Sequence, residues 1–254
     1  MYGNWIEHPG DRSNFISLLW QIRHPTLGGG ITLNLNLFGS HHVDEQRRRI
    51  RQMTIDAKTR KSIAEAVAGA LIGHAEELTE LDAAIGDGDH GYNMKRGMEA
   101  ILSASDALAD KPSGEALKAA GMQLVMKVGG ASGPLYGTLL MGLGKNLPDQ
   151  PTADDLTASF GEAVDAVKAR GKSDVGQKTM LDVLVPVLEA MRGGAGPEEI
   201  VKVAADARAA TVPMQARRGR ASFLGERSIG HVDPGARSSE LMIAAAASVL
   251  GGLS

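Results

Sequence analysis

The sequence is built from stretches whose apolar residues recur every three or four positions, the spacing of one face of an α-helix. The clearest of these stretches cover residues 156–167, 180–191 and 238–250. Two further helices are expected to start near Tyr92 and Leu135, directly after glycine-rich motifs. The whole pattern gives about eight helices and no convincing strand. The sequence therefore predicts an all-α domain in which helices pack on one another.

Composition excludes several classes of protein. Cysteine is absent, which rules out disulfide scaffolds, thiol nucleophiles and cysteine-ligated zinc. This absence fits a reducing compartment, and we expect a cytoplasmic protein. The net charge of −3 argues against a nucleic-acid-binding module driven by bulk charge. The longest apolar stretch, Leu241–Leu253, is shorter than the roughly 20 residues that cross a bilayer. We therefore expect no nucleic acid and no membrane as a partner.

Residues 1–52 differ in composition from the rest of the chain. They contain no alanine and no lysine, yet they hold both tryptophans and four of the seven histidines. Residues 28–38 alternate in the manner of a short strand, but no partner strand follows, and a lone strand is marginal. We expect residues 1–52 to be a poorly ordered extension ahead of a natural start at Met53, or else an ordinary N-terminal arm. Residues 53–254 are expected to form the helical domain.

Four segments rich in glycine, aspartate and arginine lie between the predicted helices. The first segment, 81–93, places Asp82, Asp87 and Asp89 around flexible glycines. Carboxylate oxygens are the hard ligands that Mg²⁺ and Ca²⁺ prefer, so the spacing favours a metal site. A turn that only caps the next helix is the alternative. The segment also matches a dinucleotide-binding glycine pattern and the opening of an EF-hand loop. No strand precedes it, however, and the later EF-hand ligand positions do not fit.

The other three segments suit phosphate to different degrees. Segment 129–138 leads small residues and Ser132 into a helix start, where free amides and the helix dipole favour an anion. Segment 217–236 opens with three arginines in four residues, whose guanidinium groups pair with phosphate oxygens. Segment 170–180 taken alone is typical of a solvated charged loop. Together the four segments favour Mg²⁺-dependent nucleotide binding and phosphoryl transfer, a chemistry of positioning and charge neutralisation.

In this order, the four segments resemble the motifs of the nucleotide-binding L subunit, or L domain, of the dihydroxyacetone kinase family. The motifs in this chain are GDGDHGYNM, GGASGPLYGT, GKSDVGQKTM and GRASFLGERSIGHVDPGA. The resemblance covers about 200 residues, from near Met53 to the C-terminus, and does not include residues 1–52. It implies an antiparallel barrel of eight helices with the nucleotide site in the loops at one end.

The resemblance also implies a role for each site residue. Asp82, Asp87 and Asp89 would ligate two Mg²⁺ ions that bridge the phosphates of ADP or ATP. The residues that would surround the nucleotide are His90, Gly91, Tyr92, Asn93, Ala131, Ser132, Gly171, Met180, Arg220, Asp233, Pro234 and Gly235. Of these, Ala131 and Ser132 would contact phosphate, and Gly171 and Met180 would flank the adenine. The chain departs from the family at Gln177, where an aspartate is usual, which puts the order of that loop in doubt. No catalytic side chain is assigned.

In that family the triose is held by a separate K subunit through a covalent link to a histidine. The resemblance therefore implies half of an enzyme, with ADP as a bound cofactor. A phosphotransferase-system protein fed by phosphoenolpyruvate would rephosphorylate the ADP in place. A direct ATP-dependent kinase for dihydroxyacetone or another short keto-sugar is the first alternative. A non-catalytic ADP-binding regulator and a phosphohydrolase with two Mg²⁺ ions are the others. The oligomeric state, including a homodimer, stays open.

Overall fold

The computed structural model describes residues 55–252, whose regular elements are all helices, with no strand among them. The expectations for residues 1–52 therefore lie outside the described part of the chain. The elements are α2 (Ala57–Gly73), α3 (Ala75–Ile85), α4 (His90–Ser103), α5 (Ser105–Ala109), α6 (Ser113–Lys127), α7 (Ser132–Leu143), α8 (Ala153–Gly171), α9 (Leu181–Arg192), α10 (Pro197–Ala210), the 3-10 segment η2 (Arg220–Ser228) and α11 (Pro234–Gly251). Among these described helices, none is both long and apolar enough to cross a membrane.

Local sequence signals set where several helices begin. Asp56 precedes α2, and its carboxylate accepts a hydrogen bond from the backbone N–H of Thr59 at 2.8 Å. Thr152 and Asp155 form a capping box at the start of α8, in which each side chain accepts from the other's backbone. Proline occupies the first turn of α10 and of α11, where its missing N–H costs nothing. Side-chain caps and first-turn prolines therefore mark the starts of these four helices.

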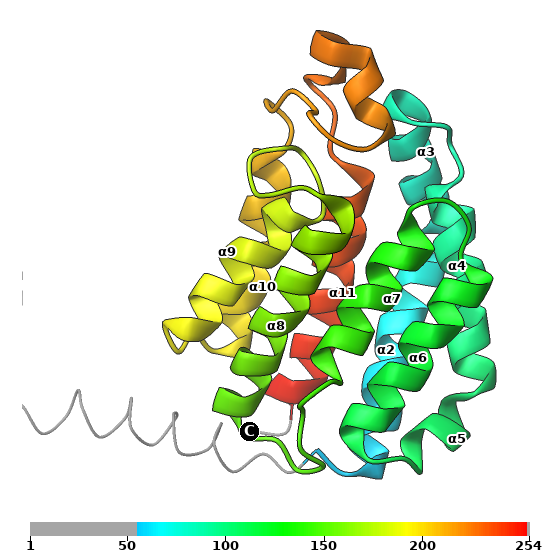
Figure 1. The fold of residues 1–254 in the computed structure, drawn as a ribbon, viewed down its shortest axis with the longest axis vertical. Helices are drawn as coiled ribbons and strands as arrows, with labels where there is room; N and C mark the ends of the chain where they lie inside the picture. Colours follow the sequence, from blue (N-terminus) through cyan, green and yellow to red (C-terminus); the bar gives the residue numbers. More distant parts are fainter. Residues whose placement is uncertain (1–54, 253–254) are drawn as a thin grey trace, which may run out of the picture. The chain divides into compact units, whose positions relative to one another are not determined.

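The helices form a closed ring. Around the ring, α4 packs against α6, each later α-helix packs against the next one along the chain, and α11 packs against α2 to close the ring (Figure 1). The short α5 contacts α2 and α6 and does not occupy a position of its own. Helices α2 and α3 both contact α4 and α11, so together they occupy one position. The ring thus has eight positions, which confirms the predicted all-α barrel. Its interior is lined by buried side chains such as Leu71, Met94, Leu124, Leu184 and Leu241.

Every second connection lies at the same end of the ring, because neighbouring helices run in opposite directions. The upper end in Figure 1 carries the connections 86–89, 128–131, 172–180 and 211–233. These are the four polar segments that the sequence singled out. Two helices begin slightly earlier than expected, α4 at His90 and α7 at Ser132. The fold therefore gathers the four candidate segments at one end of the barrel.

Candidate metal centre and phosphate-binding loops

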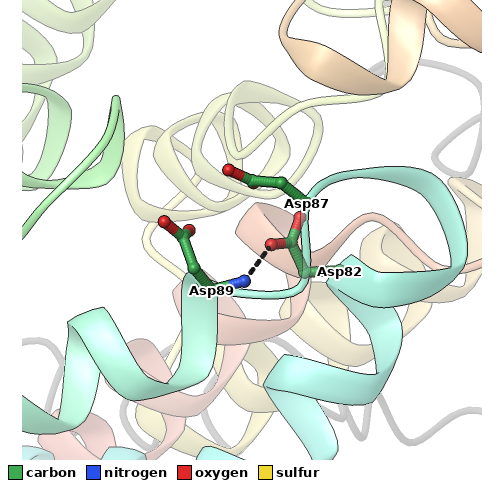
Figure 2. A group of neighbouring side chains, drawn as sticks. All are labelled: Asp82, Asp87 and Asp89. Carbon is green, nitrogen blue, oxygen red and sulfur yellow. Dashed lines mark hydrogen bonds between the residues drawn. The ribbon is translucent and has the colours of Figure 1, made fainter.

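Three carboxylates converge between α3 and α4. Asp82 lies in the last turns of α3, and Asp87 and Asp89 lie in the loop that follows (Figure 2). One oxygen from each residue lies within 4.8 Å of the others. Gly88 has a positive φ of 72°, a conformation that glycine adopts without strain, and it turns the loop between the two exposed aspartates. The structure thus brings together the three predicted metal-ligating residues.

Asp82 has a second task besides facing the other carboxylates. It is buried, and its Oδ2 accepts hydrogen bonds from the backbone N–H groups of Asp89 at 2.9 Å and His90 at 3.1 Å. These amides open α4, whose first donors have no partner within the helix. Asp82 therefore fixes the start of α4, while Asp87 and Asp89 remain exposed and available to a cation.

An uncapped helix N-terminus, that of α7, lies beside the carboxylates. Ala131 does not cap α7 with its side chain, so the first-turn amides of that helix remain suited to an anion, whereas the amides of Asp89 and His90 at the start of α4 are already bound by Asp82. The loop that leads into α7 lies close to α4. A Cβ atom built on Gly129 would lie 2.8 Å from Asn93 Oδ1, and one built on Gly130 would lie 4.0 Å from Asp89 Oδ1. The predicted phosphate loop and metal loop are therefore neighbours.

His90 connects three helices beneath the loops. Its Nδ1 lies 2.9 Å from Ser132 Oγ of α7, and its Nε2 lies 2.9 Å from Ser238 Oγ of α11. Ser238 Oγ lies 2.6 Å from the hydroxyl of Tyr136, which donates to the carbonyl of Gly235 at 2.9 Å. Burial lowers the pKa of His90 and raises the pKa of Tyr136 to about 12. His90 is thus a neutral buried link, and Asn93 beside it is also buried.

Segment 211–233 reaches the carboxylates through one arginine. Arg220, at the start of η2, places its Nη2 3.1 Å from Asp87 Oδ2. The pair is exposed, so solvent screens it and its contribution to stability is small. Its position matters more than its strength, because a guanidinium beside a metal-ligating carboxylate is also beside any phosphate that the metal would hold.

The remaining predicted residues line the same end of the barrel. Asp233 is buried and caps α11, where its carboxylate accepts from the backbone N–H of Ala236 at 2.7 Å. Burial raises the pKa of Asp233 to about 7. A Cβ atom built on Gly235 would lie 3.4 Å from Met180 N, so the start of α11 touches the start of α9. Gly171 ends α8. Gly91 is buried against α3, whereas Tyr92 is 61% exposed.

Sequence reasoning missed four buried polar residues at this end. Tyr136 and Lys178 lie inside the quoted motifs. For Lys178, a lysine that follows glycines shortly before a helix is a signal by which sequence reasoning could have found it. Asp182 accepts from the backbone N–H of Thr179 at 2.7 Å and orders the turn into α9. Ser238 lies in the first turns of an alanine-rich helix, so no local pattern marked it. These residues support the loops from below.

Comparisons with known proteins agree with this arrangement. The DAK2 domain model matches residues 84–248. The chain is 45% identical over 179 residues to the PEP-dependent dihydroxyacetone kinase, ADP-binding subunit DhaL, of Escherichia coli, covering 66% of this chain and 85% of that protein. It is 41% identical over 163 residues to the PTS-dependent dihydroxyacetone kinase, ADP-binding subunit DhaL, of Lactococcus lactis, covering 64% of this chain and 81% of that protein.

A solved structure shares the fold. The dihydroxyacetone kinase from C. freundii, in complex with AMP-PNP and Mg²⁺, superposes with a TM-score of 0.62 at 20% sequence identity. The match covers 89% of this chain and only 38% of that longer chain. At this identity the likeness concerns the fold, and the family follows from the sequence matches. The domain match covers more than half of the chain and the Escherichia coli protein matches over most of its length, so this chain belongs to the DAK2 domain family.

Proposed function

We propose that this chain is the ADP-binding subunit of a phosphoenolpyruvate-dependent dihydroxyacetone kinase, which passes a phosphoryl group to dihydroxyacetone held on a separate subunit. The observation that carries the proposal is the meeting of Asp82, Asp87 and Asp89 with the uncapped start of α7. The two ADP-binding subunits named above support it, because the chain aligns with more than four-fifths of each of them.

The carboxylates suit magnesium. Three carboxylates offer hard oxygen ligands, with one oxygen from each within 4.8 Å of the others, and Asp87 and Asp89 are exposed to a metal–nucleotide complex. In the proposal these residues hold two Mg²⁺ ions. Bound magnesium neutralises the charge that develops on the transferred phosphoryl group. Asp82 holds the start of α4 in place through its backbone contacts, so the ligand set is fixed before any ion binds.

The other loops would supply contacts for the phosphates and the base of the nucleotide. Ala131 and Ser132 would place amides and a hydroxyl on phosphate, because they begin α7 and no side chain caps that helix. Arg220, which lies beside Asp87, would pair with phosphate oxygens. Gly171 and Met180 would flank the adenine, and the turn 233–235 would complete the cap over it. Met180 and this turn lie against each other.

The nucleotide, rather than a side chain, is the proposed phosphoryl carrier. His90 is the histidine nearest the carboxylates in sequence, and both of its ring nitrogens are within hydrogen-bond distance of serine hydroxyls. It is buried, so it offers no free nitrogen to a phosphoryl group. ADP would therefore stay bound and be rephosphorylated in place by a protein of the phosphotransferase system. The acceptor would sit on a dihydroxyacetone-binding partner subunit, which docks over the same end of the barrel.

The state of the bound nucleotide tests this proposal. The purified full-length chain is desalted and denatured, and any released nucleotide is identified. Native protein is then incubated with labelled ATP and Mg²⁺. We expect stoichiometric ADP that survives desalting and does not exchange with the labelled ATP. Free exchange of ATP and ADP would point instead to a direct ATP-dependent kinase. Failure to bind any nucleotide in the presence of Mg²⁺ would contradict the proposal.

A further inference from the structure

The cap segment, residues 211–233 between α10 and α11, is a loop whose two ends are tied together. The backbone N–H of Gly230 donates to the carbonyl of Val212 at 2.8 Å. The backbone N–H of Asp233 donates to Thr211 Oγ1 at 3.2 Å, and Thr211 is fully buried. These contacts form a neck, and η2 with Arg220 lies beyond it. Whatever holds the neck closed also decides where Arg220 can reach.

The side chain of Lys178, which belongs to a different connection, lies at the centre of that neck. It belongs to the loop between α8 and α9, and its side chain is 1% exposed. Its Nζ donates to the carbonyls of Thr211 at 2.8 Å, Met214 at 3.1 Å and His231 at 2.6 Å. An ammonium group has three N–H donors, and three carbonyls from both ends of the cap segment receive them. A single side chain thereby clamps the neck.

The three carbonyl acceptors suit the charged form of this lysine, although burial opposes it. Burial lowers the pKa of Lys178, and the nearby carboxylates of Asp233 and Asp182 oppose that change. A neutral amine has only two donors and would turn a lone pair toward a carbonyl oxygen. Asp182 also holds the turn that follows Lys178, through the backbone N–H of Thr179. The lysine is therefore fixed at its base as well as at its tip.

The backbone of Lys178 shows the same constraint. Its φ is 60°, in the left-handed region that residues other than glycine adopt at a cost of about 1 kcal/mol or more. Lys172 in the same connection has a φ of 48°, but it is exposed and ends α8. Among the described residues, only position 178 combines a left-handed non-glycine backbone with a buried side chain that spans to another connection. Such a conformation persists where the surrounding contacts determine it.

We propose that Lys178 is a positioning residue for the nucleotide site, which closes the neck of the cap segment and thereby holds Arg220 and the turn 233–235 against bound nucleotide. The inference rests on the proposed function, because it concerns the same site. It adds a residue that contacts neither the carboxylates nor the predicted phosphate loop. Lys178 acts through the cap segment, and its removal should release that segment while the barrel stays folded.

Hydrogen exchange of the unmodified full-length chain is the first test. The amides of Gly230, Asp233 and Arg217 donate within the neck or to the carbonyl of Gln177, so they should be protected well above exposed loop amides. The amide of Gln150, in the exposed loop between α7 and α8, is the internal reference. If the neck amides exchange as fast as the reference amide, the neck is open and the inference is overturned. This measurement needs neither a variant nor a ligand.

The second test compares two lysine variants. Lys178→Met keeps the length of the side chain and removes all three donors, and Lys172→Met makes the same change at an exposed left-handed position. We expect Lys178→Met to raise the Kd for MgADP at least about tenfold and to speed exchange of the neck amides, since three carbonyls, including that of the buried Thr211, lose their donor. Exchange in α6 and α7 should not change. Lys172→Met should alter the Kd by less than about twofold. A folded Lys178→Met variant with unchanged affinity and unchanged neck exchange would overturn the inference.

Coupling to Arg220 separates positioning from general loss of stability. If Lys178 acts by placing Arg220, then Arg220→Ala should weaken MgADP binding in the parent chain and add little in the Lys178→Met background. Additive losses would show that the two residues act independently and would count against the inference. Should Lys178→Met not fold, the exchange of the neck amides in the unmodified chain decides. Should the unmodified chain fail to bind MgADP, the proposed function fails, while the exchange test of the neck still stands.

Discussion

The three aspartates of the acidic loop do different work although they are chemically identical. One carboxylate oxygen of Asp82 accepts hydrogen bonds from two backbone amides at the start of α4, whereas Asp87 and Asp89 are exposed. The sequence could identify the set, because three carboxylates around glycines favour a cation. It could not divide the roles, because these depend on how Gly88 turns the chain. The same holds for His90, whose burial between Ser132 and Ser238 no local pattern revealed.

The exposed aspartates allow a clean test of metal binding. We expect Asp87→Asn and Asp89→Asn each to weaken Mg²⁺-dependent ADP binding at least about tenfold, since a lost contact to a charged group is worth about 1.5–3 kcal/mol. The helical fold should persist, because neither side chain belongs to the core. Calorimetric titration with and without EDTA measures the binding, and far-ultraviolet circular dichroism measures the fold. Asp106→Asn, at an exposed aspartate on α5, is the matched control. Unchanged affinity in both variants would remove the metal assignment.

At the scale of elements, apolar spacing predicted the helices better than their ends. The stripes over 156–167 and 238–250 fall inside α8 and α11. The apolar stripe of Ile63, Val67, Leu71 and Leu78, however, predicts one helix that breaks at His74 into α2 and α3, and the arginine-rich segment contains η2. Both departures depend on tertiary contacts, since α3 packs against η2 and α4 rather than continuing an isolated stripe. A periodic pattern reports which face is buried and does not report where packing interrupts the helix.

The close approach of α3 and α4 gives a prediction about stability. A Cβ atom on Gly91 would lie 1.9 Å from the carbonyl oxygen of Ala75, so one of the two helices must shift. We expect Gly91→Ala to lower the free energy of unfolding by about 1–3 kcal/mol. Gly69→Ala is the control, because Gly69 lies within α2 with nothing within 4 Å of the new atom. That control should gain about 0.5–1 kcal/mol from better helix propensity. Chemical denaturation measures both, and equal effects would contradict the packing argument.

At the scale of the whole molecule, the closed ring brings segments that are far apart in the sequence together at one end. Neighbouring helices are antiparallel, so connections that alternate along the chain share one end, and the contact of α11 with α2 brings the last segment beside the first (Figure 1). This closure could be expected from the family resemblance but not from any single motif. Under the proposed function, four connections on separate helix pairs enclose one nucleotide, and buried side chains such as Tyr136 and Lys178 link this end of the barrel through hydrogen bonds.

The proposed division of labour predicts that the isolated chain is an incomplete kinase. Incubated with Mg²⁺, ATP and dihydroxyacetone, it should form no dihydroxyacetone phosphate and release no inorganic phosphate. Product should appear when a dihydroxyacetone-binding subunit and a phosphoenolpyruvate-fed phosphoryl donor are added, and omission of the donor should abolish turnover. Asp89→Asn under the same conditions is the control for product that does not pass through this site. Steady phosphate release by the chain alone would instead indicate a hydrolase, because an attacking water would then need no partner. Turnover with ATP and the partner subunit alone would show that the nucleotide is a substrate that leaves after each transfer. The choice of phosphoryl donor would then depend on nucleotide exchange and not on the docking of a donor protein.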